Sequence, residues 1–322
     1  MDDKPYVVKG RPDRILVAGI SRSGSSWVID ALRATPGTKC WYEPDYIDSD
    51  PNGKKPAGST GFGPYPVIEV GSDGGVHRAL WDVVYNGKIP VTRRGNVLIP
   101  LAKPFLKLPK PILHPLFKLG TKVFTAVPGG APERVAVKSV FTAFCIDWIV
   151  ETYDPKVVML QRNPLSIVSS WRDLKTPVFD LATRPYVLEN YGDRYEGNPP
   201  NENASELTKI AWAVGLITTV MSDSLERHPE WLLVNHEDLC IDSPSKFKTL
   251  CERLEIPWSE SVAEFLRRSN RPGEGLETKR VTEEQVDKWK KKLNSEEVEE
   301  ITEVLNRFPR KGWVRIPSER SG

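Results

Sequence analysis

The chain has 322 residues, a length that fits one large α/β domain or two small ones. Hydrophobic residues make up 39% of it and charged residues 27%, which excludes a wholly disordered chain because these proportions allow a sizeable core. The formal net charge is only +2, so no nucleic acid is expected as a partner, and any anion must be bound by local basic clusters.

The N-terminal segment is polar, and the first apolar run, Ile15–Ile20, is far too short for the core of a signal peptide or for a membrane span. The four cysteines lie far apart without a Cys-x-x-Cys pair, which argues against a zinc site or a disulfide framework and suits a reducing compartment. These features predict a cytoplasmic protein.

Short runs rich in valine, isoleucine and leucine predict four buried strands: Ile15–Ile20, Val135–Val140, Val157–Gln161 and Trp231–Asn235. Helical spacing of apolar residues follows each run. It is seen at 141–149, from Asn163-Pro164 onwards, at 207–217, from Ser243-Pro244 onwards and from Ser295 to Leu305, with a capping box expected between Thr282 and Gln285. Strands that alternate with helices predict an α/β fold, with a central, mainly parallel sheet flanked by helices and a ligand at the carboxyl ends of its strands.

Two segments interrupt this alternation. Residues 48–132 are rich in proline and glycine, and residues 175–205 are irregular, which is typical of binding loops or lids. Within the first segment, residues 83–132 hold eight lysines and arginines among apolar residues and no acidic residue. Such a segment fits peripheral contact with a membrane or with a lipid-bearing ligand, and it equally fits an apolar side packed on the core with the lysines in solvent.

The clearest motif is a turn of small residues between the first strand and the helix after it, Ser21-Arg22-Ser23-Gly24-Ser25-Ser26-Trp27. The N–H groups of such a turn and the positive end of the helix dipole favour an anion, and Gly24 lets the backbone approach it closely. Ser25 stands where a Walker A loop has its lysine, and no Walker B acid follows the strand at 157–161, so nucleotide hydrolysis is disfavoured. The simplest alternative is a turn that only joins a strand to a helix.

A second cluster of anion-binding groups follows the strand at 157–161. Arg162 stands at the strand end, where its guanidinium can hold two phosphate oxygens, and Asn163-Pro164 opens the next helix. Ser170 lies about two helical turns later, on the same side as Asn163.

Together these motifs resemble the sulfotransferase superfamily that uses 3′-phosphoadenosine-5′-phosphosulfate (PAPS), and the Arg-Ser-Gly-Ser-Ser run is most similar to the carbohydrate sulfotransferases and their bacterial relatives. The resemblance covers residues 14–46 and 134–293. It implies one P-loop-like, three-layer domain over about residues 12–316, PAPS as donor, adenosine 3′,5′-bisphosphate (PAP) as product, and no metal. The implied donor contacts are the 5′-phosphosulfate on Arg22, Ser23, Gly24, Ser25, Ser26 and Trp27, the 3′-phosphate on Arg162 and Ser170, and a further phosphate contact from Lys279 or Arg280.

The run Cys40–Asp45 is expected to bring the chain back to the ligand-binding end of the sheet. Pro44 biases Glu43 out of helical conformation. A similar Glu-Pro pair in the resembling enzymes implies that Glu43 is the catalytic base, while Arg22 stabilises the charge that builds on the 5′-phosphate. An ordinary loop acid or a capping residue is the alternative for Glu43, and Lys138 and His77 are lesser candidates for a part in the site.

The predicted function is therefore the transfer of a sulfuryl group from PAPS to a hydroxyl of a carbohydrate, a glycolipid or a related metabolite. The oligomeric state is left open. Two alternatives remain: a P-loop kinase or NTPase, and a non-catalytic nucleotide-binding protein that acts as a membrane adaptor.

Overall fold

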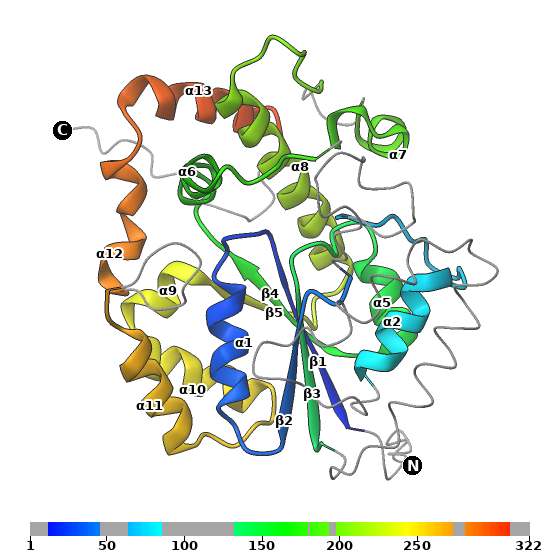
Figure 1. Ribbon diagram of the computed structural model, residues 1–322, viewed down its shortest axis with the longest axis vertical. Helices are drawn as coiled ribbons and strands as arrows, with labels where there is room; N and C mark the ends of the chain where they lie inside the picture. The colour runs from blue at the N-terminus through cyan, green and yellow to red at the C-terminus, as the bar shows by residue number, and fades with distance from the viewer. Residues whose placement is uncertain are drawn as a thin grey trace, which may run out of the picture.

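A computed structural model describes residues 12–45, 64–85, 132–179, 181–192, 198–272 and 281–309. In these residues five strands form one sheet in the order β2-β3-β1-β4-β5, and every neighbouring pair is parallel (Figure 1). The strands are β1 (Asp13–Gly19), β2 (Thr38–Tyr42), β3 (Arg134–Ser139), β4 (Lys156–Gln161) and β5 (Leu232–Asn235). The predicted α/β fold with a central parallel sheet is thus confirmed.

Helices cover both faces of the sheet. Alternate strand residues point to opposite sides, and apolar residues on both sides pack against helices. Ile15 and Val17 pack with one group of helices: α1 (Ser25–Arg33), α9 (His236–Ile241), α10 (Ser243–Arg253) and α11 (Glu260–Ser269). Leu16 and Ala18 pack on the other side with α2 (Gly75–Tyr85), α5 (Ile146–Tyr153), α6 (Pro164–Leu174), α8 (Glu206–Arg227) and α13 (Ser295–Asn306). The result is a fold of three layers.

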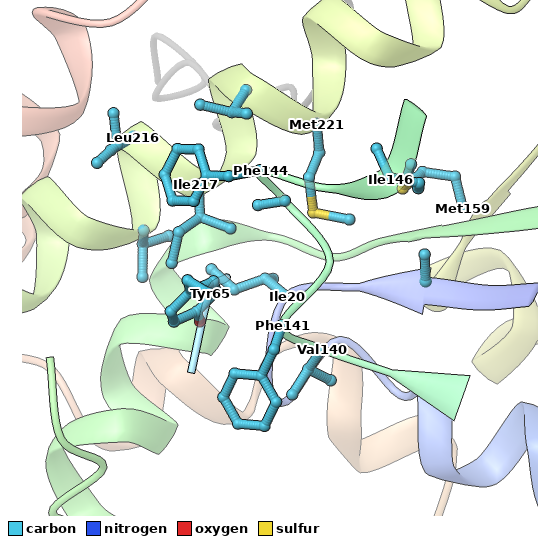
Figure 2. Close-up of a cluster of buried hydrophobic side chains, with 14 of the residues drawn as sticks. Ile20, Tyr65, Val140, Phe141, Phe144, Ile146, Met159, Leu216, Ile217 and Met221 are labelled. Carbon is cyan, nitrogen blue, oxygen red and sulfur yellow. The ribbon is translucent and has the colours of Figure 1, made fainter. Parts of the chain in front are cut away.

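The apolar cluster that contains Leu16 and Ala18 extends to the carboxyl end of the sheet, where the ligand is expected. Figure 2 shows Val140 and Phe141 beyond the end of β3, close to Tyr65 and Ile20. The rings of Tyr65 and Phe141 meet edge to face with their centroids 5.3 Å apart. Apolar side chains therefore support the loops that follow the strands.

Capping residues explain several helix boundaries. The Asn163 side chain accepts a hydrogen bond from Leu165 N, and Pro164 occupies the first turn, as predicted for α6.

The predicted capping box between Thr282 and Gln285 is wrong. In the structure Thr282 itself is helical and its N–H donates to Asn270 Oδ1, 3.0 Å away, so it ties α12 (Glu283–Val286) to the end of α11 instead of capping it.

The interrupting segments contain structure that the sequence did not predict. The helix α2 lies inside the proline- and glycine-rich segment, of which the structure describes 64–85 and 132. The basic run 83–132 lies outside the described residues except for 132 and the last three residues of α2. In the described parts of the segment 175–205, the elements between α6 and α8 are the short helices η1 (Leu181–Thr183), α7 (Pro185–Val187) and η2 (Leu188–Gly192). The last short element is η3 (Lys288–Lys291). Within the described ranges, every helix is too short or too polar to cross a membrane.

Candidate functional site

The loop between β1 and α1 makes a tight turn at the carboxyl edge of the sheet. Arg22 and Gly24 have φ angles of 72° and 93°, in the left-handed region, and Ser23 N donates to Ile20 O at 3.0 Å. No side chain caps α1, and its first turn has no acidic residue. The positive end of α1 therefore faces a cavity whose wall includes Gly24, Ser25 and Ser26.

Gly24 is closely packed against His236, the first residue of α9. A Cβ atom at position 24 would lie 2.3 Å from Cδ2 of the His236 ring, so the position requires glycine for both its φ angle and its space. His236 is buried and lines the cavity. Burial, followed by the charges of Arg162 and Arg22, holds the pKa of His236 well below its ordinary value, so its imidazole is neutral at pH 7.

The two predicted anion-binding motifs meet in space. Arg162, just after β4, donates from Nη1 to the carbonyl oxygen of Arg22 at 2.8 Å. Arg22 in turn donates from Nε to Ser170 Oγ on α6 at 3.0 Å, and Trp171 Nε1 donates to Ser21 O, also at 3.0 Å. Segments about 140 residues apart in sequence thus form one wall. Arg162 lines the cavity, and Ser170 is joined to it through Arg22.

Two other predicted residues, both described by the structure, do not line the cavity. Ser23 is buried behind the loop, with its Oγ on the side of Gly19, and His77 is buried on α2. Lys279 and Arg280 lie outside the described residues. The loop residues that do line the cavity are Ser21, Arg22, Gly24, Ser25, Ser26 and Trp27.

Glu43 lies at the cavity directly after β2. Its φ angle is 44°, its N–H donates to Lys138 O at 2.6 Å, and its carboxylate forms an ion pair with the Lys138 ammonium group. The Lys138 side chain is 7% exposed and that of Glu43 30%, and both line the cavity. The structure thus brings Glu43 and Lys138 to the same cavity as the loop and Arg162.

Residues from the C-terminal part of the chain also line the cavity. Trp27 donates from Nε1 to Ser269 Oγ at 3.0 Å, and its ring meets Phe247 edge to face. Ser269, Thr282 and Gln285 are the lining residues from this part of the chain that follow α10. No sequence motif assigns Ser269, Thr282 or Gln285 to the site, and the last two were expected only as a capping box, because isolated polar residues on separate segments share no pattern that points to a common cavity.

The cavity has a volume of about 370 Å³, which lies within the range of small-molecule sites. Among the residues that line it, the charged ones are Arg22, Lys138, Arg162 and Glu43. Three cations against one carboxylate, beside an uncapped helix start, favour an anionic ligand. In the described ranges, no group of three or more His, Cys, Asp or Glu residues is arranged to hold a metal ion.

Comparisons with known proteins give matches among solved structures. No family model matches the chain, and no curated protein matches it. A sulfotransferase domain from the curacin biosynthetic pathway is 13% identical, with 92% of this chain and 99% of that chain covered and a TM-score of 0.45. A mouse sulfotransferase complexed with PAP is 11% identical, with 91% and 82% covered and a TM-score of 0.44. Retinol dehydratase in complex with androsterone and PAP is 14% identical, with 95% and 83% covered and a TM-score of 0.44.

Proposed function

We propose that the protein is a PAPS-dependent sulfotransferase that transfers a sulfuryl group to a hydroxyl group. The observation that carries this proposal is the connection from Arg162 to the Arg22 carbonyl and from the Arg22 guanidinium to Ser170. It unites two anion-binding motifs at neighbouring strand ends, β1 and β4, which is the arrangement needed to hold a nucleotide with a phosphate at each end.

The residues present fit such a donor. The N–H groups at the start of α1 and the hydroxyls of Ser25 and Ser26 suit the 5′-phosphosulfate, since the cavity meets the helix there. Arg162 and Ser170 suit the 3′-phosphate, with Arg22 between the two groups. Trp27 offers an aromatic surface in the same cavity. Ser23 is proposed to act only through the shape of the loop, and Lys279 and Arg280 remain predicted phosphate contacts.

Glu43 is the proposed base. Its carboxylate takes the proton of the acceptor hydroxyl while the acceptor oxygen forms a bond to sulfur and the bond from sulfur to the 5′-phosphate oxygen breaks. Arg22 and the loop N–H groups stabilise the negative charge that the phosphate gains. Lys138 lies against Glu43 and adds a positive charge to the same part of the cavity.

The proposed acceptor is a hydroxyl of a carbohydrate, a glycolipid or a related metabolite. Tyr42, Val140 and Phe141 line the cavity together with Glu43 and Lys138, and this mixture of apolar and charged groups favours an acceptor with an apolar part, such as a glycolipid. A cytoplasmic protein whose basic segment 83–132 touches the membrane would meet such an acceptor at the bilayer surface. We propose a single domain over residues 12–316.

Titration calorimetry tests the donor site. Adenosine 3′,5′-bisphosphate is expected to bind more tightly than adenosine 5′-monophosphate. Arg162→Ala is expected to lower the affinity for the bisphosphate by roughly 10- to 100-fold, because about 1.5–3 kcal/mol of charged hydrogen bonding is lost. Arg267→Ala is the matched control, because Arg267 is an exposed arginine on α11 outside the cavity. Equal affinity for both nucleotides would contradict the assignment of the 3′-phosphate site.

Activity assays separate the proposal from its alternatives. When the protein is incubated with PAPS labelled in its sulfuryl group and with a lipid extract, the label is expected to appear in a lipid. Label found only in water-soluble products would contradict the glycolipid acceptor. Magnesium-dependent hydrolysis of ATP without sulfuryl transfer would favour a P-loop kinase or NTPase. Nucleotide binding with no transfer to any acceptor would favour the non-catalytic adaptor.

A further inference from the structure

The turn after β2 is attached to the end of β3 at two successive residues. Glu43 contacts Lys138 through both its N–H and its carboxylate. Asp45, two residues later, accepts a hydrogen bond from the hydroxyl of Ser139. The Ser139 Oγ lies 2.8 Å from Oδ1 and 2.7 Å from Oδ2 of Asp45. The strand register explains the match, because Tyr42 pairs with Lys138 at the end of the β2–β3 ladder.

The backbone of this turn is strained at Glu43. A φ angle of 44° is unusual for a residue with a side chain, and a following proline restricts the residue before it further. Such a conformation persists only when the contacts around it determine it. Among the described residues, the contacts of Glu43 with Lys138 and of Asp45 with Ser139 hold the turn on either side of Pro44.

Asp45 is the better anchored of the two acids. It is 0% exposed, whereas the Glu43 side chain is 30% exposed at the cavity. Ser139 Oγ also accepts the N–H of Phe141 at 3.1 Å, and Phe141 lines the cavity. The Asp45–Ser139 pair therefore connects the turn that carries Glu43 to the backbone that carries Phe141. Asp45 itself does not line the cavity.

We propose that Asp45 is a positioning residue: through Ser139 it holds Glu43 in its strained conformation at the cavity, and its ionisation changes the field at the Glu43–Lys138 pair. This inference rests on the proposed function, in which Glu43 is the base. It concerns how the base is placed and gives Asp45 no contact with donor or acceptor.

The surroundings of Asp45 make its ionisation relevant near neutral pH. Burial is the main cause that raises the pKa of Asp45, to about 7; the charge of Glu43 adds to the rise, while the Ser139 hydrogen bond and Lys138 oppose it. The charge of Asp45 in turn adds to the rise that burial causes in the pKa of Cys145, before α5, and of Tyr85 on α2. Asp45 therefore gains its charge between about pH 6 and pH 8, beside an ion pair that has to rearrange when an acceptor donates its proton.

The test measures release of PAP from PAPS with water as the acceptor. In this reaction a water oxygen bonds to sulfur, the sulfur–phosphate oxygen bond breaks and the water proton goes to Glu43. Asp45→Ala and Ser139→Ala are expected to lower kcat at least 10-fold, with the KM for PAPS and the calorimetric Kd for PAP unchanged within about twofold. Ser139→Thr, which keeps the hydroxyl, is expected to have a kcat at least fivefold higher than that of Ser139→Ala. Asp13→Ala is the matched control, since it removes an exposed carboxylate at the opposite end of the sheet.

Several outcomes would overturn the proposal. They are an unchanged kcat in folded Asp45→Ala, parallel losses of kcat and PAP affinity, and a threonine variant no better than the alanine variant. Where the alanine variant does not fold, Asp45→Asn serves: the wild-type kcat is expected to change with an apparent pKa near 7 that is absent in the asparagine variant, and the same transition in both refutes the idea. Failure of wild-type protein to bind PAP at all would instead refute the proposed function, so the two failures are distinguishable.

Discussion

Replacing Asp45 by asparagine is expected to change how stability depends on pH. The ordinary pKa of the carboxyl is 3.8 and burial raises the pKa of Asp45 to about 7 in the folded protein. Below pH 3.8 both states hold the proton; between the two values only the folded state does, so the free energy of unfolding falls as pH rises and levels off above about pH 7. Each tenfold difference in proton affinity is worth about 1.4 kcal/mol, so the full loss is about 4 kcal/mol.

Urea denaturation at pH 5 and pH 8 measures this effect. Asp45→Asn keeps an oxygen that can accept from Ser139 and removes the charge, so its stability relative to wild type is expected to rise by about 3 kcal/mol between pH 5 and pH 8. Asp13→Asn controls for the loss of a carboxylate at an exposed site. A relative change near zero would refute the argument from burial, and a change of opposite sign would mean that Lys138 stabilises Asp45 as a carboxylate.

The remaining predictions concern the loop and its support. Gly24→Ala is expected to destabilise the fold by roughly 2–4 kcal/mol in thermal unfolding, from backbone strain and the clash beneath the loop, whereas Gly71→Ala, at a φ angle of 80° with nothing within 4 Å, is expected to cost only about 1–2 kcal/mol. Equal costs would refute the packing argument. Ser170→Ala is expected to weaken PAP by several-fold in calorimetry, and an unchanged Kd would exclude Ser170 from the donor site. Trp27→Phe and Ser269→Ala are each expected to cost about 1 kcal/mol, and additive losses in the double variant would show that their hydrogen bond contributes nothing.

Four of the five strands could be predicted because each holds a run of apolar residues, and the runs Leu16–Ala18 and Val157–Leu160 are buried on both faces. The expectation that all four are buried is wrong for β5, which lies at an edge of the sheet with Leu233 exposed. The strand β2 was missed. It lies at the edge of the sheet and begins with Thr38 and Lys39, so its sequence lacks such a run. The helix α2 was missed for a different reason, since the prolines and glycines around it conceal an apolar face that packs Trp81 and Tyr85 into the core.

The parts of the site that could be predicted are those whose chemistry is local in sequence. The turn around Gly24 and the strand-end Arg162 are recognisable because a strand, a loop and a helix start follow one another directly. The pairing of Asp45 with Ser139 depends on the register of β2 against β3, and the bond from Trp27 to Ser269 depends on how α11 packs on α1. Neither relation has a signal in one sequence, because the partners are about 94 and 242 residues apart.

The order of the strands determines the order in which the groups of the site lie across the sheet. Across the sheet, β2 is followed by Glu43, β3 carries Lys138 near its end, β1 leads into the loop and β4 is followed by Arg162. Neighbouring strands are about 4.8 Å apart, so the ends of β2 and β4 are separated by roughly 14 Å. The proposed base, the proposed 5′-phosphosulfate site and the proposed 3′-phosphate site thus follow one another in the order that an in-line transfer requires, with the loop in the middle. A chain with the same residues but with β2 paired beyond β5 would place Glu43 three strand spacings, roughly 14 Å, from β1 and on the side of the 3′-phosphate site, where it could not take a proton from an acceptor on the side opposite the leaving phosphate.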